Sequence, residues 1–299
     1  MIVLVAALLV APPPPALGPG RHVRTLSVDG HQRTYRLYLS AKLPTDRRVP
    51  LILALHGAGM NSAMMEGFCG LSKTADAEGF AVAYPDGTPT SGVQTWNTGG
   101  LRGALARNKP DDVRFLEAVI DDIESCCKID PSRIYATGMS NGGMMCYRLG
   151  NELSHRIAAV APVAGTLALE KVKPARPIPL LHFHGTADTI VPYDRPARSG
   201  ASRFISFRSA PDSVRLWAEA TGCGRDPVIE EVKEVKGSRK HTYRGETGGE
   251  VILYQIEGAG HVWPGQPFPL GLIRSEMRIN ANNLIWEFFK RHSLPKPKE

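Results

Sequence analysis

The chain has 299 residues, of which 42% are hydrophobic and 22% are charged. This balance is typical of a soluble globular protein and excludes a disordered chain or a membrane bundle. The formal net charge is +7, but the lysines and arginines are scattered and form no basic stripe interleaved with aromatic residues, so we expect no nucleic-acid partner. The length suits one α/β domain, which we place at residues 21–299.

Residues 1–20 are expected to be a signal peptide or a disordered leader. An apolar run over residues 2–10 precedes four prolines and the small residues Ala16 and Gly18, as at the end of a secretory signal peptide, although no basic residue precedes the run. The run is too short to span a bilayer. We therefore expect a secreted, extracellular protein with no membrane partner.

The first segments after the leader have the periodicity of strands. Residues 23–28 and 33–39 alternate apolar and polar side chains around an Asp-Gly pair, which predicts a β-hairpin. Residues 49–55 form a continuous apolar run, as expected of a strand buried on both faces of a mainly parallel sheet. The glycine-rich segment 56–61 follows and can turn backbone N–H groups toward a site at the end of that strand.

The next segments alternate between helix and strand. We expect a helix through residues 73–77 and a strand over 80–84. Residues 88–110 are expected to be a long irregular surface segment, a kind of segment that often lines a binding site. The helical spacing of apolar residues after an aspartate cap predicts a further helix from about 111 to 127.

The second half of the chain repeats this alternation. We expect buried strands at 157–165 and 177–185, a helix at 212–221, one or two strands within 229–257, and a closing helix near 281–291. Buried strands that alternate with helices predict an α/β fold with a mainly parallel central sheet and helices on both faces. In such folds ligands bind in the loops at the strand ends.

A serine flanked by glycines lies between a predicted strand and a predicted helix. The segment Gly138-Met139-Ser140-Asn141-Gly142 has the G-x-S-x-G pattern of a nucleophile elbow, in which the two glycines give the sharp turn the space it needs. Ser140 is therefore the candidate nucleophile. It would lie near a helix N-terminus, where free N–H groups stabilise a developing negative charge.

A serine nucleophile needs a base to take its proton and an acid to hold that base. In α/β hydrolases these residues follow the serine in the order acid, then histidine. Of the aspartates after Ser140, only Asp188 directly follows a predicted core strand. His261 follows the last predicted strand through a Gly-Ala-Gly turn. The predicted catalytic triad is therefore Ser140, Asp188 and His261.

The oxyanion formed during ester attack needs fixed hydrogen-bond donors. We expect these to be the N–H of Asn141, directly after the nucleophile, and the N–H of Ala58 in the glycine-rich segment. The N–H of Gly59 is the alternative to that of Ala58.

Three further residues are candidates for substrate binding. Trp263, beside the proposed base, and Trp96 can form apolar walls for an aromatic acyl group or a polymer segment, although Trp96 serves equally well as a loop anchor. His56, at the end of a predicted central strand, is the third candidate.

No metal or cofactor is expected. His182 and His184 alternate along a predicted strand, but no third ligand accompanies them, so we interpret them as core residues or supports of the site. The five cysteines show no C-x-x-C spacing, and their odd number leaves at least one thiol unpaired in a monomer. They are Cys69, Cys126, Cys127, Cys146 and Cys223.

Several longer motifs lie between about residues 25 and 290. They are Leu55-His56-Gly57, Tyr84-Pro85-Asp86-Gly87, Trp96-Asn97, Asp111-Asp112-Val113, Gly138-Met139-Ser140-Asn141-Gly142-Gly143-Met144, His184-Gly185-Thr186-Ala187-Asp188 and Gly260-His261-Val262-Trp263-Pro264-Gly265. On these motifs the chain resembles the polyhydroxybutyrate depolymerase and feruloyl esterase family of α/β-hydrolase esterases. The resemblance implies the α/β-hydrolase fold and a secreted carboxylic ester hydrolase, with Ser140, Asp188 and His261 as its triad.

The expected function is that of a serine esterase that works through an acyl-enzyme, of the feruloyl esterase or poly(3-hydroxybutyrate) depolymerase type, on a small-molecule or polymeric ester. The alternatives are an acyltransferase of the same fold and an acetyl xylan esterase or polyester hydrolase. A serine peptidase and a non-catalytic binding module rank lower, the latter because none of the three triad positions is broken. The sequence leaves the natural ester and the oligomeric state open.

Overall fold

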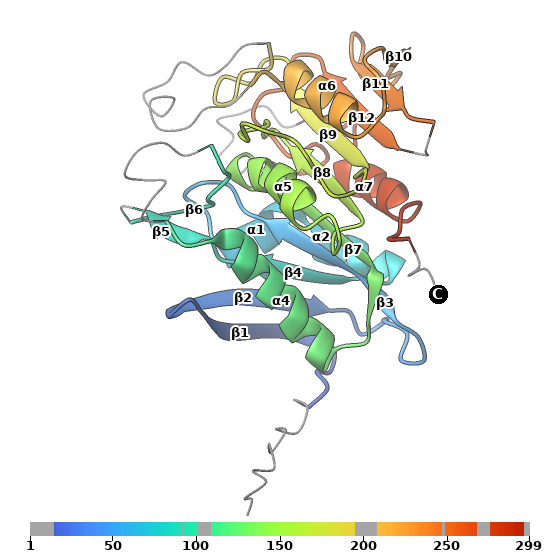
Figure 1. Cartoon of the computed structure of the whole chain (residues 1–299). Coiled ribbons are helices and arrows are strands. Elements are labelled where there is room, and N and C mark those ends of the chain that lie inside the picture. The colour runs from blue at the N-terminus through green and yellow to red at the C-terminus, as the bar shows by residue number, and fades with distance from the viewer. Residues whose placement is uncertain are drawn as a thin grey trace, which may run out of the picture.

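A sheet of ten strands runs through the molecule in the computed structural model (Figure 1), which describes residues 15–90, 92–100, 109–194, 208–246, 249–267 and 276–295. The strand order is β1-β2-β4-β3-β7-β8-β9-β12-β11-β10, and β5 and β6 form a separate two-stranded sheet. The strands are β1 (Gly20–Val28), β2 (His31–Leu39), β3 (Val49–Leu55), β4 (Ala81–Pro85), β5 (Thr88–Thr90), β6 (Val93–Thr95), β7 (Ile129–Met139), β8 (Ala159–Val163), β9 (Leu180–Gly185), β10 (Val228–Glu231), β11 (Arg239–Arg244) and β12 (Glu250–Ile256).

The centre of the sheet is parallel. Strands β4, β3, β7, β8, β9 and β12 pair in parallel, while β1–β2 at one end and β11–β10 at the other are antiparallel. Every residue of β3, β4, β8 and β9 is buried, which explains why β3, β4 and β8 are almost wholly apolar in the sequence, whereas β9 also buries His182 and His184. The mainly parallel central sheet expected from the sequence is confirmed.

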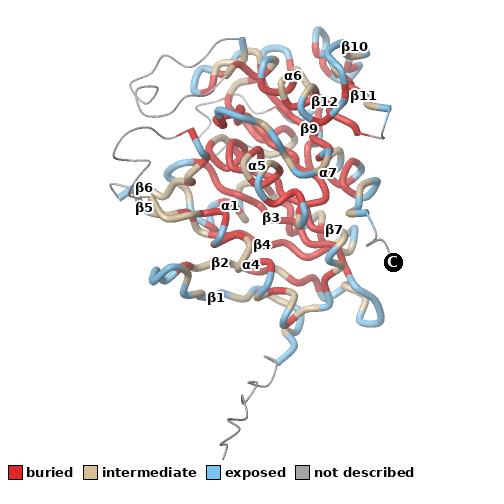
Figure 2. Tube along the Cα trace, viewed as in Figure 1, coloured by how far each residue is buried: buried red, intermediate tan, exposed pale blue. Residues whose placement is uncertain are grey.

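Helices cover both faces of the sheet, as Figures 1 and 2 show. The helices are α1 (Ser62–Cys69), α2 (Leu71–Glu78), α4 (Asp112–Cys126), α5 (Asn141–Glu152), α6 (Ala210–Ala220) and α7 (Ala281–Phe289). Buried residues of α4, α5 and α6 share one apolar cluster, and buried residues of α1, α2 and α7 share the other. The sheet separates these two clusters, so each helix buries its apolar stripe against one face.

Local sequence signals account for most of these elements. The Asp-Gly pair of the first hairpin, Asp29 and Gly30, has φ values of 51° and 76°, as required at the two central positions of a tight hairpin turn. Helix α4 begins where Asp111 accepts a hydrogen bond from the backbone N–H of Val113, and its predicted apolar stripe is buried.

The structure differs from the expected elements in three places. Helix α1, capped by Asn61, follows the glycine-rich segment and was not expected. The segment 88–110 is not wholly irregular, because β5 and β6 form a short hairpin in it; residues 101–108 lie outside the described residues. The region 229–257 contains three strands where one or two were expected.

The expected leader overlaps the folded chain. Residues 1–14 lie outside the described residues, but β1 begins at Gly20 and the N–H of Leu17 donates to the carbonyl of Cys126 at the end of α4. In the described ranges, none of the helices combines the length and the apolar content needed to cross a bilayer. All five cysteines are free thiols.

A buried ion pair ties the β5–β6 region to helix α4. The guanidinium of Arg33 donates to Asp112 Oδ1 over 2.8 Å, and the side chains are 6% and 0% exposed. The other carboxylate oxygen of Asp112 accepts the backbone N–H of Asn97 at 2.6 Å, and Thr88 donates to Oδ1. The Arg33 guanidinium also lies 3.9 Å from the ring centre of Phe115. Asp112 therefore joins β2, the segment 88–97 and α4.

We predict that Asp112→Asn lowers the free energy of unfolding by about 3–5 kcal/mol, because it leaves the buried Arg33 charge without a partner. Urea denaturation at pH 7 measures the change. Glu287→Gln is the matched control: it removes the exposed partner of Lys290 on α7 and should cost less than about 1 kcal/mol. Equal losses for the two variants would contradict the prediction.

Candidate active site

Ser140 lies in a strained turn between β7 and α5. Its φ of 56° and ψ of −118° are unusual for a residue with a side chain. Its N–H donates to the carbonyl of Val163 at the end of the neighbouring strand β8, and its own carbonyl accepts the N–H of Met144 in α5. These two bonds hold the turn on both sides.

The flanking glycines are required by close backbone contacts. A Cβ on Gly138 would lie 2.7 Å from the carbonyl of Gly142, and a Cβ on Gly142 would collide with the carbonyl oxygen of Leu55 at the end of β3. Strand β3, strand β7 and helix α5 therefore meet backbone to backbone beneath Ser140. The geometry expected of a G-x-S-x-G elbow is present.

Asp188 and His261 are in direct contact. His261 Nδ1 lies 2.7 Å from Asp188 Oδ2, and both residues are buried, at 8% and 4% exposure. Because an ionised carboxylate only accepts hydrogen bonds, Nδ1 carries the proton and Nε2 is left with a free lone pair. This tautomer is the one a general base needs.

The turn after β9 holds the carboxylate of Asp188. Its Oδ1 accepts the backbone N–H groups of Ile190 and Val191, each at 2.9 Å. His184 Nε2 lies 3.5 Å from Oδ2. The carboxylate thus has donors on both oxygens, which fixes the direction in which it faces His261. No sequence motif pointed to these two backbone donors.

The three predicted triad residues lie at one edge of the sheet. Ser140 follows β7, Asp188 follows β9 and His261 follows β12, and these strands run parallel in the order β7-β8-β9-β12. The carboxyl ends of parallel strands share one edge. The N–H of Ala187 donates to the carbonyl of Ala259, which ties the Asp188 turn to the His261 loop.

The glycine-rich loop after β3 lies beside the serine. A Cβ on Gly57 would be 3.4 Å from the Cβ of Ser140. Ala58 is exposed, and neither its N–H nor that of Asn141, the first residue of α5, has an acceptor among the described residues. The N–H of Gly59, however, donates to the carbonyl of Gln94 at 2.9 Å. Gly59 is therefore not available as an oxyanion donor, and that alternative was wrong.

His56 and Trp96 are buried supports and do not face a ligand. His56 is fully buried; its Nδ1 donates to the carbonyl of Gly57 and its Nε2 accepts the N–H of Gly87, both at 2.8 Å. Burial lowers the pKa of His56, consistent with this neutral tautomer. Trp96 is 1% exposed and donates from its indole to the carbonyl of His56. The expected substrate contacts of both residues are corrected, and Trp96 is a loop anchor.

Trp263 is also buried. It is 0% exposed, and its indole N–H donates to Asn282 Oδ1 on α7 at 2.8 Å. It anchors the His261 loop to that helix, so the expected wall for an acyl group is not formed by its ring. The side chain of Asn141 has a similar bracing role that the sequence did not reveal, since its Oδ1 accepts the backbone N–H of Trp96 at 2.6 Å.

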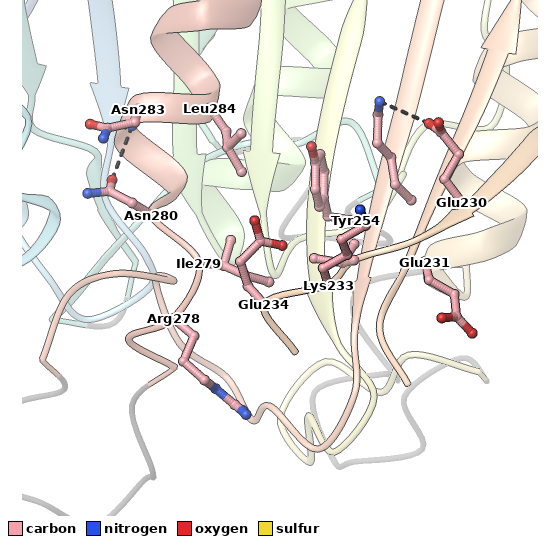
Figure 3. Close-up of a pocket in the computed structure, with 12 residues that line it drawn as sticks. Glu230, Glu231, Lys233, Glu234, Tyr254, Arg278, Ile279, Asn280, Asn283 and Leu284 are labelled. Atoms are coloured by element: carbon pink, nitrogen blue, oxygen red, sulfur yellow. Dashed lines mark hydrogen bonds and ion pairs between the residues drawn. The ribbon is translucent and has the colours of Figure 1, made fainter. Parts of the chain in front are cut away.

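A groove of about 420 Å³ lies between β10–β12 and the start of α7 (Figure 3). Figure 3 shows Tyr254 of β12 opposite Leu284 of α7, with Glu230 and Glu231 beyond Tyr254 and Glu234 beside Ile279. The groove borders the segment that follows His261, because the N–H of Ala281 donates to the carbonyl of Pro264. None of the three predicted triad residues lines it. Within the described ranges, no group of three or more His, Cys, Asp or Glu side chains could hold a metal.

Comparison with known proteins identifies relatives over most of the chain. Residues 33–192 match the family model described as "Esterase PHB depolymerase". "Putative esterase NocK" of Nocardia uniformis subsp. tsuyamanensis is 33% identical over 264 residues, which cover 82% of this chain and 75% of that protein. Feruloyl esterase B of Piromyces equi is 33% identical over 261 residues, which cover 84% of this chain but only 43% of that protein.

Solved structures share the fold. An acetyl xylan esterase from Aspergillus awamori superposes with a TM-score of 0.64 at 14% identity, over 90% of this chain and 99% of that one. A thermostable esterase superposes with a TM-score of 0.62 at 19% identity, over 92% of this chain and 63% of that one. These likenesses confirm the α/β-hydrolase fold. Since the family model covers more than half of the sequence, the chain belongs to the esterase PHB depolymerase family of α/β-hydrolase esterases.

Proposed function

We propose that this protein hydrolyses carboxylic esters through an acyl-enzyme formed on Ser140, with His261 as the base and Asp188 as the residue that orients it. The observation that carries the proposal is the 2.7 Å hydrogen bond between His261 Nδ1 and Asp188 Oδ2, at the sheet edge where Ser140 occupies its strained turn. Membership of an esterase family supports the reaction class.

In the first half of the reaction, Ser140 Oγ attacks the ester carbonyl carbon while its proton passes to His261 Nε2. A C–O bond forms, and the carbonyl oxygen becomes an oxyanion. Asp188 stabilises the imidazolium that results, because its carboxylate faces Nδ1. His261 then gives the proton to the departing alkoxide, and the acyl group remains on Ser140.

In the second half, His261 takes a proton from water, which attacks the acyl-enzyme. A second tetrahedral oxyanion collapses, Ser140 recovers its proton from His261, and the carboxylic acid leaves. We assign the N–H groups of Asn141 and Ala58 to both oxyanions. The loss of one such donor typically costs about 2.7–4 kcal/mol in the barrier.

We propose an ester with an apolar acyl part as the substrate. Exposed apolar side chains lie near the candidate site: Val93 is 46% exposed and packs by the Gly59 loop, and Ile190 is 52% exposed in the Asp188 turn. The names of two relatives, a feruloyl esterase and a bifunctional acetylxylan esterase/xylanase, support feruloyl esters and acetylated xylan as candidate substrates. The family description adds polyhydroxybutyrate. We further propose that the protein is secreted and acts on polymeric esters outside the cell.

We predict that Ser140→Ala lowers kcat/KM for p-nitrophenyl acetate by about 10⁵- to 10⁶-fold, because it removes the nucleophile. Circular dichroism should show an unchanged fold. Ser125→Ala, which alters an exposed serine on α4, is the control and should keep wild-type activity. Substantial turnover by Ser140→Ala would exclude the mechanism.

We predict that Asp188→Asn lowers kcat by about 10⁴-fold with a small effect on KM. An amide N–H facing Nδ1 of His261 would favour the imidazole tautomer that lacks a free lone pair on Nε2. Steady-state kinetics with the same ester measure the change. The exposed Asp226 supplies the control, Asp226→Asn, which should behave as wild type. A loss below about tenfold at Asp188 would refute its role.

A side-by-side panel of methyl ferulate, acetylated xylan and poly(3-hydroxybutyrate) film identifies the substrate class. We expect turnover of at least one of them by the wild type and of none by Ser140→Ala, with the free acid identified by mass. If products form only when a sugar or lipid alcohol is added, the protein is an acyltransferase and the hydrolase proposal is wrong.

A further inference from the structure

Three buried polar side chains form a line of hydrogen bonds that ends at the turn of Asp188. The hydroxyl of Tyr147 on α5 is 2.7 Å from His182 Nδ1, and His182 Nε2 is 3.0 Å from His184 Nδ1. His184 Nε2 is 2.7 Å from the carbonyl of Val191. Tyr147 and His182 are 0% exposed, and His184 is 1% exposed. The line runs from the helix that begins after Ser140 to the turn that holds Asp188.

The direction of every hydrogen bond in this line follows from its last acceptor. A carbonyl only accepts, so His184 Nε2 carries a proton, and in the neutral ring Nδ1 is then an acceptor. His182 must therefore donate from Nε2, which leaves its Nδ1 to accept the hydroxyl proton of Tyr147. Burial lowers the pKa of both histidines, in agreement with two neutral rings.

The charge of His184 matters because of its position. Its Nε2 is 3.5 Å from Asp188 Oδ2, the same oxygen that accepts His261 Nδ1. A positive His184 would compete with His261 for the carboxylate. The imidazolium that forms on His261 during ester attack would then be less stable, and the barrier would be higher.

Tyr147 controls whether His184 can take a second proton. If His184 Nδ1 carried a proton, His182 Nε2 would have to accept a hydrogen bond instead of donating one. The ring proton of His182 would then lie on the Nδ1 of His182. The hydroxyl proton of Tyr147 would lose its acceptor, since Tyr147 has no other hydrogen-bond partner among the described residues. An unpaired buried hydroxyl is costly, so the tyrosine holds the line in its neutral form.

We propose that Tyr147 and His182 are positioning residues that keep His184 uncharged, so that the carboxylate of Asp188 serves His261 alone. The inference rests on the proposed function. The titratable or polar groups that face His184 come from its own strand, the Asp188 turn, the His261 loop and β12. They are His182, Asp188, Tyr193, His261 and Gln255; Tyr147 of α5 reaches His184 only through His182, and Gln255 in turn contacts His241.

The first test is the pH profile of Tyr147→Phe with p-nitrophenyl acetate. Without the hydroxyl, His182 is free to accept, and His184 gains a proton as the pH falls. Because this protonated form is less active, the acid limb of kcat should move to higher pH by about one unit. The ratio of kcat at pH 6 to kcat at pH 8.5 then falls about tenfold. At pH 8.5 kcat should lie within about threefold of wild type, and KM should be unchanged.

Two further variants separate this effect from a loss of stability. Tyr135→Phe removes another buried tyrosine hydroxyl, which bonds the carbonyl of His292 on the opposite face of the sheet, and its profile should match wild type. His184→Gln keeps a donor for Val191 but cannot be protonated. In the Tyr147→Phe/His184→Gln double variant the acid limb should return to that of His184→Gln alone.

Nitrogen NMR of the histidine rings tests the wild type directly, with His184→Gln to assign its signals. We expect His184 to stay neutral, with the proton on Nε2, from pH 8.5 to 5.5. Titration of His184 near its ordinary pKa, an acid limb for Tyr147→Phe that superposes on wild type, or an equal loss of kcat at every pH would overturn the inference. These results leave the ester hydrolase proposal intact if Ser140→Ala is inactive. An active Ser140→Ala would overturn the function itself.

Discussion

The backbone contact between the end of β3 and the start of α5 is the constraint on which the candidate site depends. Gly142 has no room for a side chain against the carbonyl of Leu55, so helix α5 starts directly on the sheet. The same contact brings the loop after β3 next to Ser140. The two proposed oxyanion donors, the N–H groups of Ala58 and Asn141, belong to the two elements that this contact joins. The strain at Ser140 is maintained by this surrounding backbone.

The two faces of the sheet carry different polar contacts around the candidate site. On the face of α5, buried tyrosine and histidine side chains lead toward the turn of Asp188. On the other face, Trp263 and Asn282 fasten the loop of His261 to α7. His261 and Asp188 are therefore supported from opposite faces of one sheet, and they contact each other at its edge. A disturbance of either helix layer would change the distance between them.

The strands and the elbow could be predicted because their signals are local, and the places of Asp188 and His261 after core strands predicted their contact. The triad as a whole stays a prediction. Continuous apolar runs predicted β3 and β8, and the glycine spacing predicted the turn at Ser140. Burial of His56, Trp96 and Trp263 could not be predicted, since it arises from partners such as Gly87 and Asn282 that are distant in sequence. The hydrogen bond from the N–H of Gly59 to the carbonyl of Gln94 could not be predicted either, because it is a tertiary contact.

The sheet ends on each side in an exposed strand, and the composition of β10 has a consequence for the behaviour of the protein in concentrated solution. This strand has only four residues, all exposed, and it finishes with Glu230 and Glu231. A neighbouring molecule that paired with β10 would desolvate two carboxylates and would gain only a few backbone hydrogen bonds. The outer edge thus discourages intermolecular strand pairing and fibril growth, although the strand also contains the solvent-facing Val228 and Ile229.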